Sequence, residues 1–176
     1  KERSRDNVDF CHEDIKAVYH ELFDEALERY NAKQKRSDRK IENYYEKIRQ
    51  GKQEKLFYEV IFQIGNRDDM NVRSEEGQLA KQILSDFMAD FQSRNPNLHV
   101  FSAHLHMDEE TPHIHIDFVP VITGSKRGLD TRVSLKGALA EQGFEGGTRG
   151  ATEWNQWIES EKKELAAVME RYGVEW

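Results

Sequence analysis

The stretch HLHMDEETPHIH, residues 104–115, decides the fold of this chain because it predicts a β-hairpin. Histidines alternate with apolar residues on both sides of a central run of turn residues. Side chains two apart in a strand lie on the same face, so the alternation predicts strands at 98–107 and 113–121, joined by a turn at 108–112. One face of this hairpin would be apolar and rest on helices, and the other would carry imidazoles.

The register of the hairpin follows from its tight turn. Pairing residue 107 with residue 112 sets His106 opposite His113 and His104 opposite His115. Opposed Cβ atoms in such a pair are about 5 Å apart. Four imidazoles so close would repel when protonated and would cost free energy if buried unpaired.

A divalent cation removes both costs, because neutral imidazole is a good ligand for first-row metals. The alternative is a hairpin whose histidines are merely exposed on the surface. Histidine ligands without a carboxylate or thiolate leave open positions on a metal, which is typical of catalytic sites. Such a site fits a hydrolase that activates water as well as an enzyme that polarises a phosphate.

The rest of the chain mixes helices and strands without a regular βαβ alternation. Periodicity predicts helices at 12–35, 42–50, 75–94, 134–141 and 151–172, and a strand at 56–64. This order favours an α+β fold with an antiparallel sheet flanked by helices. A length of 176 residues fits a single domain spanning residues 1–176.

Composition restricts the class of protein. The sequence has no apolar run long enough for a membrane span, no visible secretory signal and a single cysteine, which together predict a cytoplasmic protein without a membrane partner. A net charge of −7 argues against a nucleic-acid partner, but positive charge is concentrated in two stretches. We take these stretches as candidate DNA contacts: Arg36, Arg39 and Lys40 in one, and Lys126, Arg127 and Arg132 in the other.

Residues 106–115 match every fixed position of the pattern H-x-D-E-x-T-P-H-x-H. The stretch therefore resembles the signature of the MobV (Mob/Pre) plasmid mobilisation relaxases, which are bacterial HUH endonucleases. Arg5, Asn7 and Phe10 resemble part of the second motif of that family, and residues 35–40 resemble its basic segment. The resemblance implies an antiparallel sheet flanked by helices.

The resemblance also implies a site. His106, His113 and His115 would bind a divalent metal, Mn²⁺ or Mg²⁺, and Glu109 would orient or deprotonate the nucleophile. The first motif, which carries that nucleophile, would precede residue 1. A chain without it is expected to bind metal and DNA but to nick poorly. His104 falls outside the signature and could be a fourth ligand, a partner of a ligand or a DNA contact.

The implied reaction is metal-dependent nicking and rejoining of one strand at a plasmid transfer origin, through a covalent 5′-phosphoryl-enzyme intermediate. The implied partner is single-stranded or hairpin origin DNA, together with other mobilisation proteins.

Several alternatives stay open. A replication initiator or transposase could carry the same hairpin, and so could a metalloenzyme unrelated to DNA. A partner-binding module that uses the helix at 151–172 would leave the histidine face unexplained. Tyr44 or Tyr45 could serve as a nucleophile, although packing explains their helical spacing better. Trp154, Trp157 and Trp176 could stack on bases, although core packing explains them better.

Overall fold

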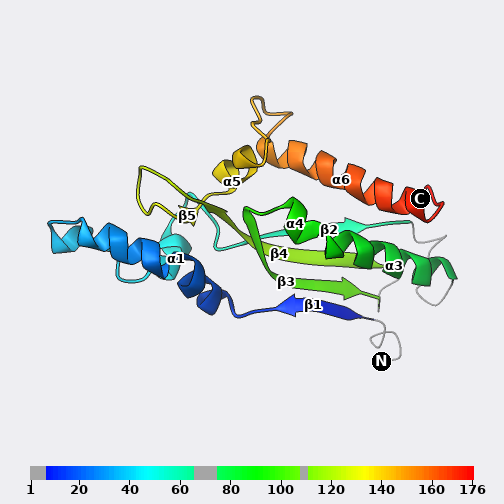
Figure 1. The fold of residues 1–176 in the computed structure, drawn as a ribbon, viewed down its shortest axis with the longest axis horizontal. Helices are drawn as coiled ribbons and strands as arrows, with labels where there is room; N and C mark the ends of the chain where they lie inside the picture. Colours follow the sequence, from blue (N-terminus) through cyan, green and yellow to red (C-terminus); the bar gives the residue numbers. More distant parts are fainter. Residues whose placement is uncertain (1–6, 66–74, 108–110) are drawn as a thin grey trace.

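The computed structural model describes residues 7–65, 75–107 and 111–176, and it places one antiparallel sheet at the centre of the chain (Figure 1). The strand order is β1-β3-β4-β2, and a short fifth strand, β5, pairs with β4. The strands are β1 (Val8–His12), β2 (Tyr58–Gln63), β3 (Leu98–His106), β4 (His113–Ile122) and β5 (Arg132–Val133). The expected α+β fold, with an antiparallel sheet flanked by helices as in relaxases, is confirmed.

The register of the central hairpin is the predicted one. His106 pairs with His113, and His104 pairs with His115. Two features of β3 were not expected from the alternation. A bulge between Val100 and Ser102 shifts the pairing with β4, and β1 adds an edge strand beside β3. A bulge adds one residue to a strand, so the alternation of side chains changes phase there.

Four helices cover one face of the sheet: α3 (Glu75–Ala89), α4 (Phe91–Arg94), α5 (Leu135–Glu141) and α6 (Glu153–Arg171). Their apolar sides form the main core with alternate residues of the central strands, including Leu105, Ile114 and Ile116. The prediction of a single helix at 75–94 is wrong in one respect, because the helix is broken at Asp90. Asp90 has φ −100° and ψ −2°, and aspartate weakens a helix interior because its side chain competes for backbone hydrogen bonds.

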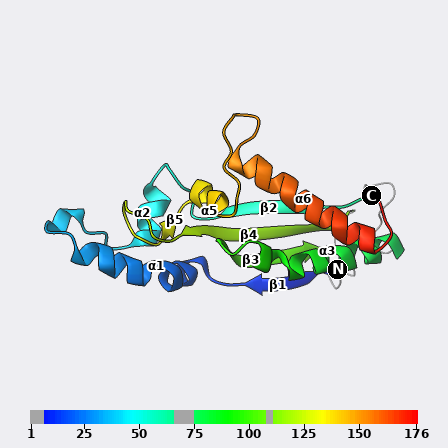
Figure 2. The ribbon, with the colours of Figure 1, turned by 45° about the horizontal axis from the view of Figure 1, so that its top comes forward.

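Helices α1 (Ile15–Ala32) and α2 (Tyr44–Gln50) lie against the opposite face, at one end of the sheet (Figures 1 and 2). Asp14 begins α1 by accepting a hydrogen bond from the backbone N–H of Ala17. Buried residues of α1, including Phe23, form a second core with Phe101 and Val119 of the sheet. The sheet therefore has one face covered by four helices and one face covered only in part.

A buried polar group fastens α6 to the loop before β3. Glu161, which is 3% exposed, pairs with Arg94 at 2.7 Å. The Asn95 side chain donates to Glu161, and its oxygen accepts a hydrogen bond of 2.8 Å from the Trp157 indole. Trp157 is fully buried, so it belongs to the core and is not a base-stacking surface. None of the helices in the described residues is both long and apolar enough to span a membrane.

Candidate functional site

Three histidines from two neighbouring strands form a triangle on the less covered face of the sheet. His106 ends β3, and His113 and His115 begin β4. The centroids of their rings are 5.3 Å apart for the 106–113 pair, 4.6 Å for the 106–115 pair and 4.9 Å for the 113–115 pair. The two-residue period places His113 and His115 on one face, and the hairpin register adds His106. The register had predicted four imidazoles at one point, His104 included, and the structure brings these three together.

Two of these imidazoles are oriented by hydrogen bonds that their Nδ1 atoms donate. Nδ1 of His113 lies 3.0 Å from the carbonyl oxygen of Thr111, and Nδ1 of His115 lies 3.4 Å from Oε1 of Glu59. Both partners are acceptors, so we assign the ring proton to Nδ1 in each case. A ring protonated at Nδ1 is unprotonated at Nε2, which is the form in which histidine binds a metal.

A pair of carboxyl groups lies next to His115 in the sheet. Glu59 of β2 lies opposite Asp117 of β4 in the sheet register. Burial, with the hydrogen bond to Glu59 and the charge of Glu59, raises the pKa of Asp117 to about 7. The pKa of Glu59 lies below its usual range, mainly because its carboxylate accepts a hydrogen bond from Asp117 and also because it faces His115. The proton of the pair therefore resides on Asp117, and Glu59 keeps the negative charge that faces His115.

His104 lies on the same face, but its two ring nitrogens hydrogen-bond within the chain. Nδ1 lies 2.6 Å from Oδ1 of Asp9, and Nε2 lies 2.8 Å from the hydroxyl oxygen of Ser102. The ring also contacts His12, with 5.6 Å between the centroids. These partners hold His104 toward β1, so the structure does not present it as a fourth ligand in this conformation.

The short β1 strand supports the end of the hairpin. The side-chain oxygen of Asn7 accepts a hydrogen bond of 2.6 Å from the backbone N–H of Met107, the residue that follows His106. Phe10 packs against the main core. Two of the residues that resemble the second family motif therefore contact the structure that carries the histidines. Arg5 and the candidate catalytic residue Glu109 lie outside the described residues.

The basic residues expected to contact DNA lie away from the histidine triangle. The segment that follows α1 and the loop between β4 and β5 are at the left in Figure 1, whereas β3 ends at the right. Arg29 of α1 makes two hydrogen bonds of 2.8 Å to Asp130 and so links α1 to that loop.

The exposure of these basic residues differs. The exposed ones are Arg36, Arg39, Lys40, Lys126 and Arg127. Arg36 pairs with Asp38 at 2.8 Å. Arg132 is half-buried and donates a hydrogen bond of 3.0 Å to the Ser125 hydroxyl. Their role as DNA contacts stays a prediction.

Tyr44 does not offer a nucleophile, because its ring is buried in the second core. Its hydroxyl oxygen accepts a hydrogen bond of 3.0 Å from the backbone N–H of Val133, and burial raises its pKa. Tyr45 is half-buried and packs edge-on against Tyr19, with 5.3 Å between the centroids. The packing explanation for this pair of tyrosines is the better one.

Sequence reasoning did not find the roles of Asp9 and Glu59 beside the histidines. The period-two pattern of residues 57–63 contains a signal, since it places Glu59 on one face with Ile61. The pattern does not say which strand lies next to β4, and that neighbour decides the contact.

Comparison with protein-family models matches residues 1–142 to the Mob/Pre family, whose description is plasmid recombination enzyme. Among curated proteins and solved structures, no match is found.

Proposed function

This chain belongs to the Mob/Pre family of plasmid recombination enzymes, and on that premise we propose that it is a plasmid mobilisation relaxase whose histidine triangle holds a divalent metal. The reaction would be the site-specific nicking and rejoining of one DNA strand at a transfer origin. The observation that carries the proposal is the convergence of His106, His113 and His115, whose ring centroids lie 4.6–5.3 Å apart.

Three imidazoles fit a first-row dication such as Mn²⁺ better than Mg²⁺, which prefers oxygen ligands. His113 and His115 direct Nδ1 toward protein acceptors, which makes Nε2 the unprotonated nitrogen of each ring. Three imidazoles would leave further coordination positions open for phosphate oxygens or water. When bound, the metal would neutralise charge on the scissile phosphate and help to position it.

The charge of the surrounding face supports a cation there. The carboxylates of Asp9 and Glu59 flank the histidines through their contacts with His104 and His115. A DNA phosphate approaching this face without a cation would meet negative charge. A bound dication would make the local charge of this face positive, so metal binding and DNA binding are expected to be coupled.

The chain's own residues would orient the reacting groups. Glu59 and the carbonyl of Thr111 hold two of the imidazoles, and Asn7 holds the backbone at the end of β3. Glu109, which follows β3 in the sequence, would orient or deprotonate the nucleophile. The basic residues at the far end of the molecule would hold a longer stretch of the single strand or origin hairpin.

The proposed reaction exchanges the phosphodiester bond of the DNA for a covalent bond between the protein and the 5′-phosphate. A nucleophilic side chain attacks phosphorus, the bond from phosphorus to the 3′-oxygen breaks, and the 3′-hydroxyl leaves with a proton. The 5′-phosphate stays covalently attached to the protein. Attack of the 3′-hydroxyl on that phosphorus reverses these steps and restores the strand, so rejoining needs no external energy source.

Titration of chelator-treated protein with Mn²⁺ in a calorimeter tests the site. Each of the variants His113→Ala and His115→Ala is expected to lose one equivalent of bound Mn²⁺ relative to the wild type. In parallel, fluorescence anisotropy measures the affinity for a labelled single strand with and without Mn²⁺. Mn²⁺ is expected to strengthen binding by the wild type and to have a much smaller effect on the two variants.

Two outcomes would contradict the proposal. Unchanged Mn²⁺ stoichiometry in both variants would remove the histidine triangle as the metal site. Normal Mn²⁺ binding without affinity for single-stranded DNA would instead favour a metalloenzyme with another substrate. Circular dichroism of each variant shows whether it keeps the wild-type fold.

A further inference from the structure

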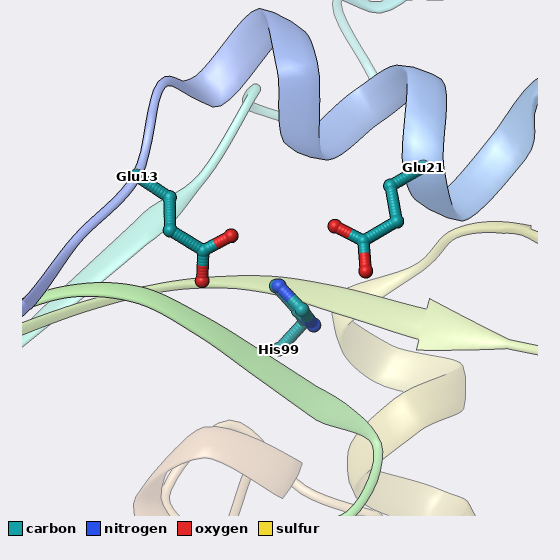
Figure 3. Close-up of side chains that lie close together, drawn as sticks. All are labelled: Glu13, Glu21 and His99. Carbon is teal, nitrogen blue, oxygen red and sulfur yellow. The ribbon is translucent and has the colours of Figure 1, made fainter.

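A second group of metal-ligating side chains lies on the same face of the sheet, under α1. Figure 3 shows the carboxylates of Glu13 and Glu21 pointing toward the imidazole of His99 from two sides. Glu13 precedes α1, Glu21 lies in the second turn of α1, and His99 is near the start of β3. One ligand atom from each residue lies within 4.8 Å of the others.

This group is separate from the histidine triangle. His99 and His106 are near opposite ends of β3. Seven residues of extended strand span roughly 23 Å, which is too far for one ion to contact both groups. A cation bound here would therefore be independent of the proposed function, which concerns the other end of β3.

The charges of the group are unbalanced. Within the described part of the chain, no lysine or arginine forms an ion pair with Glu13 or Glu21, and no hydrogen bond joins either carboxylate to His99. Nε2 of His99 is buried, and no atom of residues 7–65, 75–107 or 111–176 forms a hydrogen bond with it. Two converging carboxylates repel each other, and a buried ring nitrogen without a partner costs free energy. One cation would offset the repulsion between the two carboxylates and would give the ring nitrogen a partner.

We infer that Glu13, Glu21 and His99 form a second divalent cation site, which fastens the start of α1 to β3. Bonds from a metal to nitrogen or carboxylate oxygen are about 2.1 Å long, so neighbouring ligand atoms on one ion are roughly 3.0 to 3.5 Å apart. A small rotation of the two exposed glutamates would bring the observed 4.8 Å limit into that range. Water would fill the other positions, since both carboxylates are exposed.

The donor set indicates which ion the site takes. One imidazole and two carboxylates suit a first-row dication such as Mn²⁺ or Zn²⁺. Mg²⁺ and Ca²⁺ prefer oxygen ligands throughout and are expected to bind more weakly. The ion would link the β1–α1 junction, where Glu13 also donates a backbone hydrogen bond of 2.7 Å to Phe101, to the strand that carries His106.

The test uses the His113→Ala/His115→Ala double variant, in which the other site is disabled. Calorimetric titration with Mn²⁺ is expected to show one remaining equivalent in that background. Adding Glu21→Gln is expected to weaken this binding at least tenfold, and adding His99→Asn should have a similar effect. The matched control is Glu28→Gln, an exposed glutamate further along α1, which is expected to leave the Mn²⁺ affinity within twofold.

A thermal melt with and without Mn²⁺ provides a second readout. Mn²⁺ should raise the melting temperature of the double variant, and Glu21→Gln should abolish the rise while Glu28→Gln keeps it. Absence of any Mn²⁺ binding by the folded double variant would overturn the inference. Equal effects of Glu21→Gln and Glu28→Gln would overturn it too, because they would show only a general charge effect. Neither result bears on the histidine triangle, whose own test is the loss of an equivalent from the wild type.

Discussion

Replacing Glu59 by glutamine tests whether the carboxylate behind His115 tunes the proposed metal site. Loss of such a carboxylate partner lowers metal affinity by about 10- to 100-fold in metalloenzymes, because the ligating imidazole becomes less basic and less well oriented. The distance from Nδ1 of His115 to Oε1 of Glu59 is 3.4 Å, and the Glu59 side chain is 41% exposed. A long contact that is open to solvent contributes less than a short buried one. We therefore expect the effect of Glu59→Gln to lie at the lower end of this 10- to 100-fold range. Mn²⁺ binding should be about tenfold weaker, which corresponds to about 1.4 kcal/mol of binding free energy.

Asp9→Asn is the matched control for this experiment. Asp9 also contacts a histidine Nδ1 on the same face, at 2.6 Å, but its partner is His104, which is outside the triangle. Asp9→Asn should leave the affinity of the histidine triangle within twofold of the wild type. The assay is competition against a Mn²⁺ chelator at fixed pH, in the Glu21→Gln background so that only one site is read. Equal affinities for Glu59→Gln and the wild type, or equal losses for the two carboxylate variants, would refute the assigned role of Glu59.

Three further predictions concern the framework. Glu161→Ala should lower the free energy of unfolding in urea by about 3 kcal/mol, because it leaves Arg94 and Asn95 without their buried partner, whereas the exposed Glu164→Ala should change it by less than about 0.5 kcal/mol. Tyr44→Phe should lower the free energy of unfolding by about 1 kcal/mol, because the backbone N–H of Val133 loses its acceptor, and it should leave single-strand binding unchanged. A Tyr44→Phe protein with native stability but no DNA binding would instead indicate a functional role for this tyrosine. Asp14→Ala should lower the melting temperature by an amount equivalent to about 1 kcal/mol, since the N–H of Ala17 loses its cap, and Asp14→Ser should recover most of the loss.

The sequence by itself determined the hairpin, its register and the gathering of histidines on one face, although it predicted four imidazoles at one point and the structure brings three together. These features depend on residues that are close together in the chain. The two-residue period assigns each histidine to a face, and a short turn leaves little freedom in how the strands pair. The positions of α1, α2, α5 and α6 also followed from local periodicity, to within a few residues of the observed ends. The break at Asp90 did not, because the apolar stripe continues through it to Phe91, which is fully buried.

Only the tertiary structure decided which side chains surround the histidines. Glu59 reaches His115 because β2 pairs with β4, and Asp9 reaches His104 because β1 pairs with β3. Glu13 and Glu21 approach His99 for a related reason, since α1 packs across the bulged start of β3. Glu59 and His115 are 56 residues apart in the chain, and Asp9 and His104 are 95 residues apart. Which distant strands and helices become neighbours is set by the burial of apolar surface across the whole domain, which no local pattern in the sequence records.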